Sequence, residues 1–440
     1  MTEVMLFGSA ARNAKNIAAA PQRLVNCYFE PTGDTPVLRS VLGMEPKAQL
    51  TGVFVRALET VDGQIYAVCD GRLWRIEADG TAHNLGAVDD GDATISGNNG
   101  LVAVTVNGRY FTYTPSTVTE RTPLWDAGSA CFVGNYTVLT QLGGRQFQWS
   151  DIADAADLPA LNFSTADGQD DNIVRAVELS GSLVILKEGS HELWYNTGSA
   201  GANAFQRASG GVYDVGLAGF NLFTRLIGSA FMVGSDGRAH IMSAGSIRPV
   251  SIPAVEEAIR DCRPQYCFSY EDRGHTFCVV TFRDCPAWVY DLATGEWHER
   301  ASGVDLAPWS ASCAAKMGGK WYVGRDGGAV DVLAPVYTDG STPLVREATT
   351  KGLQQDGLRM ILREFEIFPR QGFDAGTVTL FVSRDGGVTW GDAKPKALGP
   401  VGNYAGRMIW RNIGQGRRWA FKVRVSDPVE VQISAKGRIA

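Results

Sequence analysis

The sequence predicts an all-β protein in which a β-propeller fills most of the chain and a smaller β-rich domain follows it. Three observations lead to this fold class. Short apolar strands alternate with tight turns, these hairpins recur at intervals of about 35 to 47 residues, and 51 of the 440 residues are glycine. So many glycines are unusual in a helical chain and suit one that turns often.

Length and composition describe a folded chain. At 440 residues it exceeds what one simple core usually holds, so we expect one large repetitive domain or two to three modules. The 45% hydrophobic and 20% charged composition excludes a disordered chain, and no apolar run is long enough to predict a membrane span. Met1–Ala20 has no signal-peptide pattern, so we expect a mature N-terminus. The net charge of −6 argues against wholesale wrapping of nucleic acid.

Turn residues define the hairpins. Asn-Gly, Asp-Gly and Gly-Gly pairs accept the positive φ angles that match the twist of the flanking strands. Each pair between two apolar runs therefore predicts a hairpin from local sequence alone. The predicted hairpins lie at 65–76, 101–113, 136–149, 183–195, 230–242, 276–290 and 320–333.

The spacing of the hairpins predicts blades of four strands. Flanking segments such as Val55–Val61 supply the additional strands, and seven such units fit between about Val53 and Val345. Six blades are the alternative if one unit belongs to another module. Leu101–Val106 is apolar on both faces, as blade sheets stacked face to face require. An array of β-sandwiches is the rival interpretation, because periodicity alone does not exclude it.

Helix is scarce, and one boundary stands out. Ala254–Asp261 is predicted to be a short helix, with Ser251 as its cap and Pro253 in its first turn. The stretch 335–346 is rich in Pro, Thr, Asp, Gly and Ser and marks the best domain boundary. We therefore predict an N-terminal arm at 1–50, the propeller at 51–343 and a basic β-domain at 344–440.

The eight cysteines are scattered along the sequence, and most lie in apolar segments that are typical of strands. Cys262 with Cys267, and Cys278 with Cys285, miss the spacing of a zinc site, and no pair of histidines completes one. We predict reduced, packed thiols in a protein assembled in the cytosol, with metal binding and a disulfide as the alternatives.

One motif is known from enzymes of propeller fold. Ser383–Trp390 matches the Asp-box S-x-D-x-G-x-x-W, in which Asp385 would bond turn amides while Trp390 packs beneath the hairpin. A sialidase would show several boxes, an arginine triad and a nucleophilic tyrosine. A single box therefore predicts a stabilised turn and no catalysis.

No other segment predicts a reaction, a cofactor or a metal. The sequence contains no P-loop and no G-x-S-x-G motif. Asp167, Asp170 and Asp171 resemble a calcium loop, but no glutamate stands at the twelfth position, so a solvated loop is predicted. We predict no catalytic residue, no cofactor and no bound metal.

Positive charge is concentrated at the C-terminal end. Between Lys394 and Ala440, ten Lys and Arg stand against two Asp and Glu, a balance of +8 that leaves −14 for the remainder. This polarity favours a contact with DNA phosphates or with an acidic neighbouring subunit, while alternating basic residues on the outer face of strands are the plain alternative. The candidate interface residues are Arg407, Arg411, Arg417, Arg418, Lys422 and Arg424.

Motifs near both ends of the chain resemble one known family. The N-terminal motif reads PQRLVNCYFE at 21–30 and LRSVLGM at 38–44, and the C-terminal motif reads MIWRNIGQGRRWAFKVRV at 408–425. They resemble the opening and closing motifs of packaged-DNA stabilization proteins, the tail hub or nozzle proteins of short-tailed bacteriophages. The helix, hairpins and Asp-box-like turn between them agree, so the resemblance spans most of the chain.

The resemblance implies a structural virion protein of the phage tail, assembled in the host cytoplasm and without enzymatic activity. Family members form six-fold rings below the portal and its adaptor, extend the DNA conduit and close it after packaging. The implied partners are further copies in a homohexamer, the portal adaptor, a tail needle or plug, tailspikes or tail fibres, and the packaged double-stranded DNA. The arm and the C-terminal domain are expected to pack together as a platform on the adaptor, partly through the basic tail.

Two other classes of function remain open at this point. A carbohydrate-active propeller, either sialidase-like or a tail depolymerase, would cluster carboxylates in a pocket at the top of the blades. A monomeric propeller that binds peptides or proteins would stay a single small particle at all concentrations.

Overall fold

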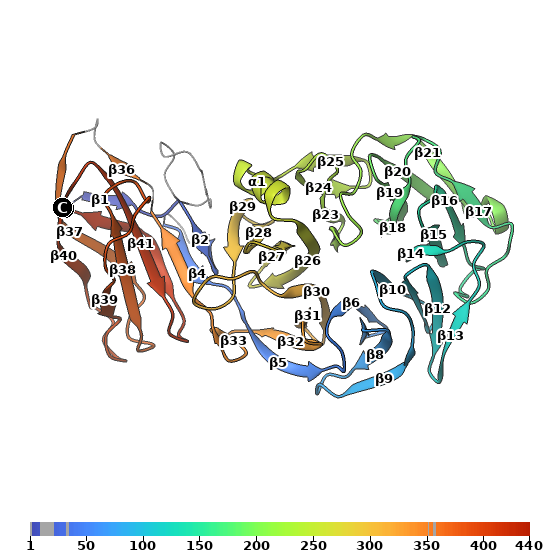
Figure 1. Cartoon of the computed structure of the whole chain (residues 1–440), viewed down its shortest axis with the longest axis horizontal. Coiled ribbons are helices and arrows are strands. Elements are labelled where there is room, and N and C mark those ends of the chain that lie inside the picture. The colour runs from blue at the N-terminus through green and yellow to red at the C-terminus, as the bar shows by residue number, and fades with distance from the viewer. Residues whose placement is uncertain (1, 9–21, 32–34, 351, 355–357) are drawn as a thin grey trace.

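The computed structural model describes residues 2–8, 22–31, 35–350, 352–354 and 358–440, and nearly all of its regular structure is β. Figure 1 shows a ring of small sheets on the right and a second β unit on the left. This arrangement confirms the predicted all-β class. The pairing of the strands shows how the two units are connected.

Within the described residues, seven sheets of four antiparallel strands form the ring, as predicted. In chain order the first four blades are β6 (Val55–Val61), β7 (Gln64–Cys69), β8 (Arg72–Ile76) and β9 (Ala82–Ala87); β10 (Ala93–Asn98), β11 (Leu101–Val106), β12 (Arg109–Thr114) and β13 (Thr117–Arg121); β14 (Ala127–Val133), β15 (Tyr136–Gln141), β16 (Gln146–Trp149) and β17 (Phe163–Thr165); and β18 (Ile173–Leu179), β19 (Ser182–Lys187), β20 (His191–Asn196) and β21 (Phe205–Tyr213).

The remaining three blades complete the ring. They are β22 (Phe223–Leu226), β23 (Ser229–Val233), β24 (Ala239–Ser243) and β25 (Ser246–Pro249); β26 (Pro264–Asp272), β27 (His275–Phe282), β28 (Ala287–Asp291) and β29 (Glu296–Arg300); and β30 (Ala311–Met317), β31 (Lys320–Arg325), β32 (Ala329–Ala334) and β5 (Gly43–Gln49). The short strands β33 (Thr338–Asp339) and β34 (Thr342–Pro343) extend the seventh sheet beyond β5.

Two of the predicted turns have the expected backbone geometry at both positions. Asp70 and Gly71 have φ angles of 39° and 73°, and Asn107 and Gly108 have φ angles of 48° and 81°. Positive φ at both positions lets the two strands continue with their natural twist. The seven hairpins are confirmed, and positive φ at both turn positions is confirmed at these two turns. In the turns Gly143-Gly144, Asp236-Gly237 and Asp326-Gly327, one residue of each pair has positive φ: Gly143, Gly237 and Gly327.

The seventh blade corrects one part of the predicted arm. The arm was expected to lie on the C-terminal domain, but β5 pairs with β32 as the outermost strand of this blade. Strands from the two ends of the propeller segment thus share one sheet, which closes the ring. Local pattern could not show this, because the paired positions Met44 and Leu333 lie 289 residues apart in the sequence (333 − 44).

The helix α1 (Pro253–Asp261) lies between the fifth and sixth blades, but its cap differs from the prediction. The N-cap residue is Ile252, and no side chain caps the helix. The Ser251 hydroxyl instead lies 3.0 Å from the Glu256 carboxylate. Pro253 stands at the first helical position as expected, where its missing amide hydrogen costs nothing.

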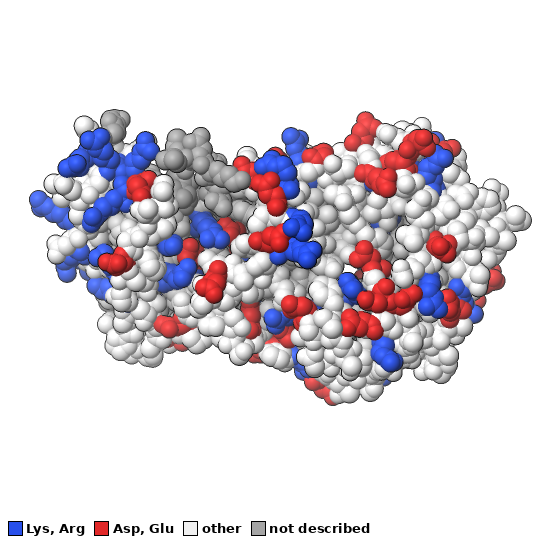
Figure 2. Space-filling view, in the orientation of Figure 1, with Lys and Arg blue, Asp and Glu red and all other residues white. Residues whose placement is uncertain are grey.

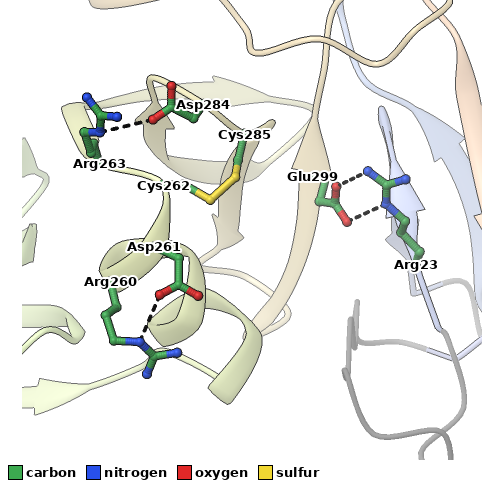
Figure 3. The surroundings of a disulfide bond; sticks show 8 residues. All are labelled: Arg23, Arg260, Asp261, Cys262, Arg263, Asp284, Cys285 and Glu299. Carbon is green, nitrogen blue, oxygen red and sulfur yellow. Dashed lines mark hydrogen bonds and ion pairs between the residues drawn. A yellow bond between two sulfur atoms is a disulfide. The ribbon is translucent and has the colours of Figure 1, made fainter.

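A disulfide between Cys262 and Cys285 overturns part of the cysteine prediction (Figure 3). Cys262 ends α1 and Cys285 lies in the loop between β27 and β28, with their Cα atoms 5.8 Å apart. The 23-residue separation hides this proximity, because only the folded sixth blade brings its hairpin loop back to the helix end. The other six cysteines are free thiols, five of them buried, and burial raises the pKa of Cys27 and of Cys131 to about 12.

Two further sheets form the second unit, on the left in Figure 1. One contains β1 (Thr2–Met5), β3 (Cys27–Glu30), β4 (Val37–Ser40), β42 (Gln432–Ile439), β37 (Met360–Pro369) and β40 (Met408–Gly416). The other contains β2 (Leu24–Val25), β35 (Arg346–Thr349), β41 (Arg418–Val425), β38 (Thr377–Ser383), β39 (Lys394–Ala397) and β36 (Leu353–Gln354). The N-terminal strands β1, β3 and β4 thus complete the C-terminal domain, as predicted for the platform.

The core of this unit lies between its two sheets. Phe365 of β37 stacks on Phe421 of β41, with ring centroids 4.1 Å apart, and both rings are fully buried. Trp410 of β40 packs 6.1 Å from Phe365. Rings from facing sheets that interdigitate in this way define a β-sandwich.

One continuous sheet joins the sandwich to the propeller. The outer strand of the sixth blade, β29, pairs with β2, and β2 pairs with β35 of the sandwich. Arg23, just before β2, donates two hydrogen bonds of 2.8 and 2.6 Å to the Glu299 carboxylate of β29 (Figure 3). A paired, bidentate contact of this kind fixes geometry as well as charge.

Asn26 forms the centre of the joint. Its side-chain amide donates to the carbonyls of Ala301 (2.9 Å) and Val345 (2.8 Å), and its carbonyl oxygen accepts from the Ala301 amide. Arg300, 1% exposed, donates to the same oxygen and forms an ion pair of 2.7 Å with Asp339. The buried charge is therefore held by groups from the arm, the sixth blade and the linker between the domains.

Candidate interaction surface

Strand β41 separates the basic face of the sandwich from its core. Trp419, Phe421 and Val423 point inward and are buried, while Arg418, Lys422 and Arg424 alternate with them on the outer face. This period of two follows from strand geometry. Sequence alone could not show whether the outward charges are free to bind a partner.

Two of these basic residues are used within the sandwich. The Glu347 carboxylate of β35 accepts from Arg424 at 3.0 Å and lies 3.9 Å from the Lys422 ammonium group. The Lys422 ammonium group also lies 4.7 Å from the ring centre of Trp390. Partial burial lowers the pKa of Lys422. Lys422 and Arg424 therefore serve the fold, as the plain alternative predicted.

Two more predicted interface residues are paired on the other sheet. Arg407 donates hydrogen bonds of 2.7 and 2.9 Å to the buried Glu366 carboxylate, and this contact lowers the pKa of Glu366. Arg411 donates to Glu364 at 2.9 Å but remains largely exposed. The six predicted residues therefore do not form one surface.

Arg417 and Arg418 lie at one end of the sandwich together with arginines that the sequence analysis did not select. Arg359 precedes Met360, which pairs with Gly416, and Arg384 donates to the carbonyl of Ile413 at 3.0 Å. The side chains of Arg359, Arg384, Arg417 and Arg418 are exposed, and within the described residues none of them forms an ion pair. We call this group the arginine tip: Arg359, Arg363, Arg384, Arg417 and Arg418.

The Asp-box holds the backbone of the arginine tip. The Asp385 carboxylate accepts from the amides of Val388 and Thr389, each at 3.0 Å, and from the Ser383 hydroxyl. These hydrogen bonds lower the pKa of Asp385 to about 2 despite its partial burial. Asp385 also forms a β-bridge with Arg418, so the box sets the backbone position of that residue. The motif is a turn stabiliser, as predicted.

Figure 2 shows where this charge lies on one face of the molecule. Lys and Arg gather over the upper left, on the sandwich, while Asp and Glu are more frequent over the propeller. From Leu344 to Ala440 the chain carries 16 Lys and Arg against 9 Asp and Glu, a balance of +7. Residues 51–215, the first four blades, carry 9 against 20, a balance of −11. The molecule is therefore polarised between its two domains.

The loop that resembled a calcium site is neutralised by basic side chains. Asp171 lies 2.7 Å from the fully buried Lys187 ammonium group, Asp167 pairs with Arg207 at 2.6 Å, and Asp170 pairs with Arg145. The solvated loop that the sequence predicted is confirmed, since residues 167–170 are exposed, and Lys187 anchors the loop to the fourth blade at Asp171. Among the described residues, no cluster of His, Cys, Asp and Glu is arranged to hold a metal ion.

The innermost strands of the blades enclose a central cavity of about 480 Å³. Its lining includes Glu59, Glu178, Arg175 and Arg225. Arg225 donates to Glu178 at 2.9 Å, and enclosure raises the pKa of Glu59 although the two arginines oppose the shift. Acidic and basic groups thus line the same cavity.

Searches of known proteins identify both domains. Residues 3–335 match the family described as "Bacteriophage P22 Gp10, beta-propeller", and residues 345–437 match "Bacteriophage P22 Gp10, beta-sandwich". A search of the curated proteins found no match. In the part of the chain that the structure describes, no helix is long and apolar enough to cross a membrane.

Solved structures resemble the chain only loosely. The computationally designed Ika8 protein is 14% identical (TM-score 0.41), with 66% of this chain and 99% of that one covered. The Pan2 WD40 domain of Neurospora crassa is 9% identical (TM-score 0.44), with 67% and 95% covered. PorZ, a surface component of the type-IX secretion system of Porphyromonas gingivalis, is 14% identical (TM-score 0.41), with 74% and 45% covered. Similarities at this level carry no functional argument.

The two family matches follow the two domains and together cover most of the chain. The terminal motifs noted in the sequence lie within those matches, which confirms the resemblance that they indicated. The chain belongs to the bacteriophage P22 Gp10 family of phage tail proteins.

Proposed function

We propose that the protein is a tail hub, or nozzle, of a short-tailed phage. In this role six copies form a ring below the portal and its adaptor, extend the DNA conduit and retain the packaged DNA. Assembly takes place in the host cytoplasm, and the ring holds a tail needle or plug and lies beside tailspikes or fibres. The observation that carries the proposal is the continuous sheet β29–β2–β35 between propeller and sandwich. Such a sheet transmits load between a ring-shaped body and a docking platform without a flexible linker.

The sandwich end opposite the arginine tip offers a surface suited to the adaptor. Phe373 and Tyr404 are 50% and 66% exposed, and their rings meet edge to face at 5.4 Å. The Arg370 guanidinium group lies 3.6 Å from the ring centre of Phe373. Exposed Phe, Tyr and Arg in one cluster are typical of the residues that dominate protein interfaces. We assign this aromatic end to the docking of the platform on the adaptor.

Ordered loops present the aromatic end. Gly372 has a φ angle of 86°, and a Cβ atom there would lie 2.5 Å from the Tyr404 ring. The Gly402 amide donates to the Gly372 carbonyl at 2.9 Å, and the Gln371 side chain donates to the Leu398 carbonyl at 2.7 Å. A surface ordered before binding loses less conformational entropy when a partner arrives.

The experiment uses virion cores that lack this protein but retain portal and adaptor. Wild-type protein should bind the tail vertex, and Phe373→Ala/Tyr404→Ala should lose at least tenfold in affinity for the cores. Ile227→Ser, which removes a 91% exposed apolar side chain from a propeller turn, is the matched control and should bind as wild type. Failure of the wild-type protein to bind cores would refute the tail hub, whereas normal binding of the double variant would refute only the assignment of the aromatic end.

Deletion of the basic tail is a poor test of the same idea. Residues 394–440 contain β39, β40, β41 and β42, which supply strands to both sheets of the sandwich. Their removal would expose the core around Phe365 and destroy the platform. Point substitutions are therefore required.

A glycan-cleaving enzyme is the second candidate, because Glu59 has a raised pKa inside a cavity and such groups recur at active sites. Incubation of the purified protein with host-surface polysaccharide should release no new reducing ends. Release that disappears in Glu59→Gln would instead establish the enzyme.

A further inference from the structure

We infer that the arginine tip of one copy docks on an acidic, apolar rim of the third blade in the next copy. The inference rests on the proposed ring, and it names the two surfaces that close it. The partner is thus a second copy of this chain. DNA phosphate and the adaptor are the alternatives that the experiment below separates.

The arginine tip has the composition of a protein interface. Leu358, Ile361 and Val388 lie among its arginines with more than half of each side chain exposed. Ile361 belongs to β37, and Val388 belongs to the turn that Asp385 holds. Phosphate recognition requires cations but no apolar neighbours. A mixed cluster of arginine and aliphatic side chains therefore favours a protein partner with both acidic and apolar residues.

The third blade carries such a surface. Its loop 150–162, between β16 and β17, contains Asp151, Asp154 and Asp157 but no Lys or Arg. Within the described residues, no basic group forms an ion pair with any of these three carboxylates. Ile152 and Leu161 of the same loop are exposed, Leu161 to 76%. We call these five residues the blade-three rim.

The rim loop is fixed before any partner arrives. The Ala153 amide donates to the Asn135 carbonyl at 2.8 Å, and the buried Tyr110 hydroxyl donates to the Ala155 carbonyl at 2.6 Å. The Asp151 amide donates to the Asp157 carbonyl at 2.9 Å, which closes the loop on itself. The positions of its carboxylates are therefore set by the blade, which limits the entropic cost of docking.

The two surfaces lie at opposite ends of the molecule. In Figure 1 the sandwich with β36 and β37 is at the left margin, and β17 of the third blade is at the right. Different patches at opposite ends form a heterologous contact, which repeats from copy to copy and closes into a ring when the rotation permits. The opposite balances of the two regions, +7 and −11, also steer copies into this head-to-tail approach.

The test is a charge swap between the two surfaces. One variant is Arg417→Glu/Arg418→Glu at the tip, and the other is Asp154→Lys/Asp157→Lys at the rim. Each variant alone should reduce complete rings on adaptor-bearing cores at least tenfold, as counted by electron microscopy. An equal mixture of the two should restore rings, because each Glu tip meets a Lys rim and each Arg tip meets an Asp rim.

Matched controls change the same charge elsewhere. Arg260→Glu/Arg263→Glu alters two exposed arginines near the end of α1, and Glu188→Lys/Asp305→Lys alters two exposed acids of the propeller. Both controls should form rings as the wild type does. All variants should show the same circular dichroism spectrum and melting temperature within a few degrees, so that a folding defect is recognised.

Each outcome decides between the partners. Normal rings with the rim variant would overturn the inference, and so would a mixture that stays defective. If the tip contacts DNA, the tip variant alone loses retention of packaged DNA while the rim variant assembles normally. If the tip contacts the adaptor, the tip variant alone no longer binds cores while the rim variant assembles normally. If wild-type protein does not bind cores, the proposed tail hub fails as well, which separates that failure from a failure of the tip and rim alone.

Discussion

The propeller and the sandwich differ in how far apart in the sequence their paired strands lie. In the first blade, β7 and β8 pair across the two-residue turn Asp70-Gly71. In the sandwich, Leu38 of β4 pairs with Ile433 of β42, close to the other end of the chain. The blades can therefore form from local contacts, whereas the sandwich needs both termini before its sheets are complete.

Because the two domains differ in this way, the contacts between β29, β2 and β35 determine whether propeller and sandwich unfold together. The N-terminal segment leaves the sandwich after β4, contributes β5 to the seventh blade and thereby ties the two domains together. Asn26, Arg23 and the β2 ladder lie on that path. Substitutions in this connection should therefore destabilise the molecule, with the largest effect at Asn26.

Asn26→Ala should destabilise the protein by about 4 kcal/mol, because it leaves two buried carbonyls and the Arg300 guanidinium group without a partner. Asn26 has a φ angle of 55°, so part of any loss comes from backbone strain. Asn99→Ala is the control: Asn99 has a φ angle of 48° but is exposed, and it should cost about 1 kcal/mol or less. Denaturant unfolding measures both, and equal losses would contradict the role of the joint.

Acid should weaken the same region through His298. Burial, with the charges of Arg300 and His275, lowers the pKa of His298 to about 3. In the unfolded chain His298 binds a proton near pH 6.5, whereas in the folded chain it stays neutral down to about pH 3. The free energy of unfolding is therefore at its full value above pH 6.5 and falls as the pH drops toward 3. The loss should reach about 3 kcal/mol at pH 4. His298→Gln should flatten this part of the stability curve.

Removal of the disulfide should cost about 3 kcal/mol, the loop-closure estimate for its 23-residue separation. Cys262→Ser/Cys285→Ser tests this by thermal unfolding with and without a reductant. The reductant should lower the melting temperature of the wild type and leave that of the variant unchanged. A variant as stable as the oxidised wild type would show that α1 and the sixth-blade hairpin stay together without the bond.

The smallest effect is expected from the Arg23–Glu299 ion pair. Its geometry is bidentate, but Arg23 is 30% exposed, so a coupling of about 1 kcal/mol is expected. A double-mutant cycle with Arg23→Gln and Glu299→Gln isolates this value. The cycle should also show whether propeller and sandwich melt together, since a weakened joint should broaden or split the calorimetric transition.

Local sequence was sufficient for the hairpins of the blades. Asp70-Gly71 and Asn107-Gly108 specify turns by their own backbone preferences, and those turns place the strands of each blade in register. The closing strand β5 could not be predicted in this way, because its partner β32 is specified only when the ring is complete. The Cys262–Cys285 bond was missed for the same reason.

The sequence predicted where the positive charge lies but not which arginines are available to a partner. Composition located the positive charge in the C-terminal region, and the alternation in β41 was visible in the sequence. Which arginines are available depends on partners from distant strands, such as Glu347 for Arg424 and Glu366 for Arg407. Arg359 and Arg384 joined the tip only through strand register and the turn built by Asp385.

The most direct test of the central claim is a cryo-electron microscopy reconstruction of adaptor-bearing virion cores after addition of the purified protein. The account predicts a six-fold ring at the tail vertex, with Phe373 and Tyr404 against the adaptor and DNA passing along its axis. A protein bound away from that axis, or particles that remain single copies at every concentration, would contradict it.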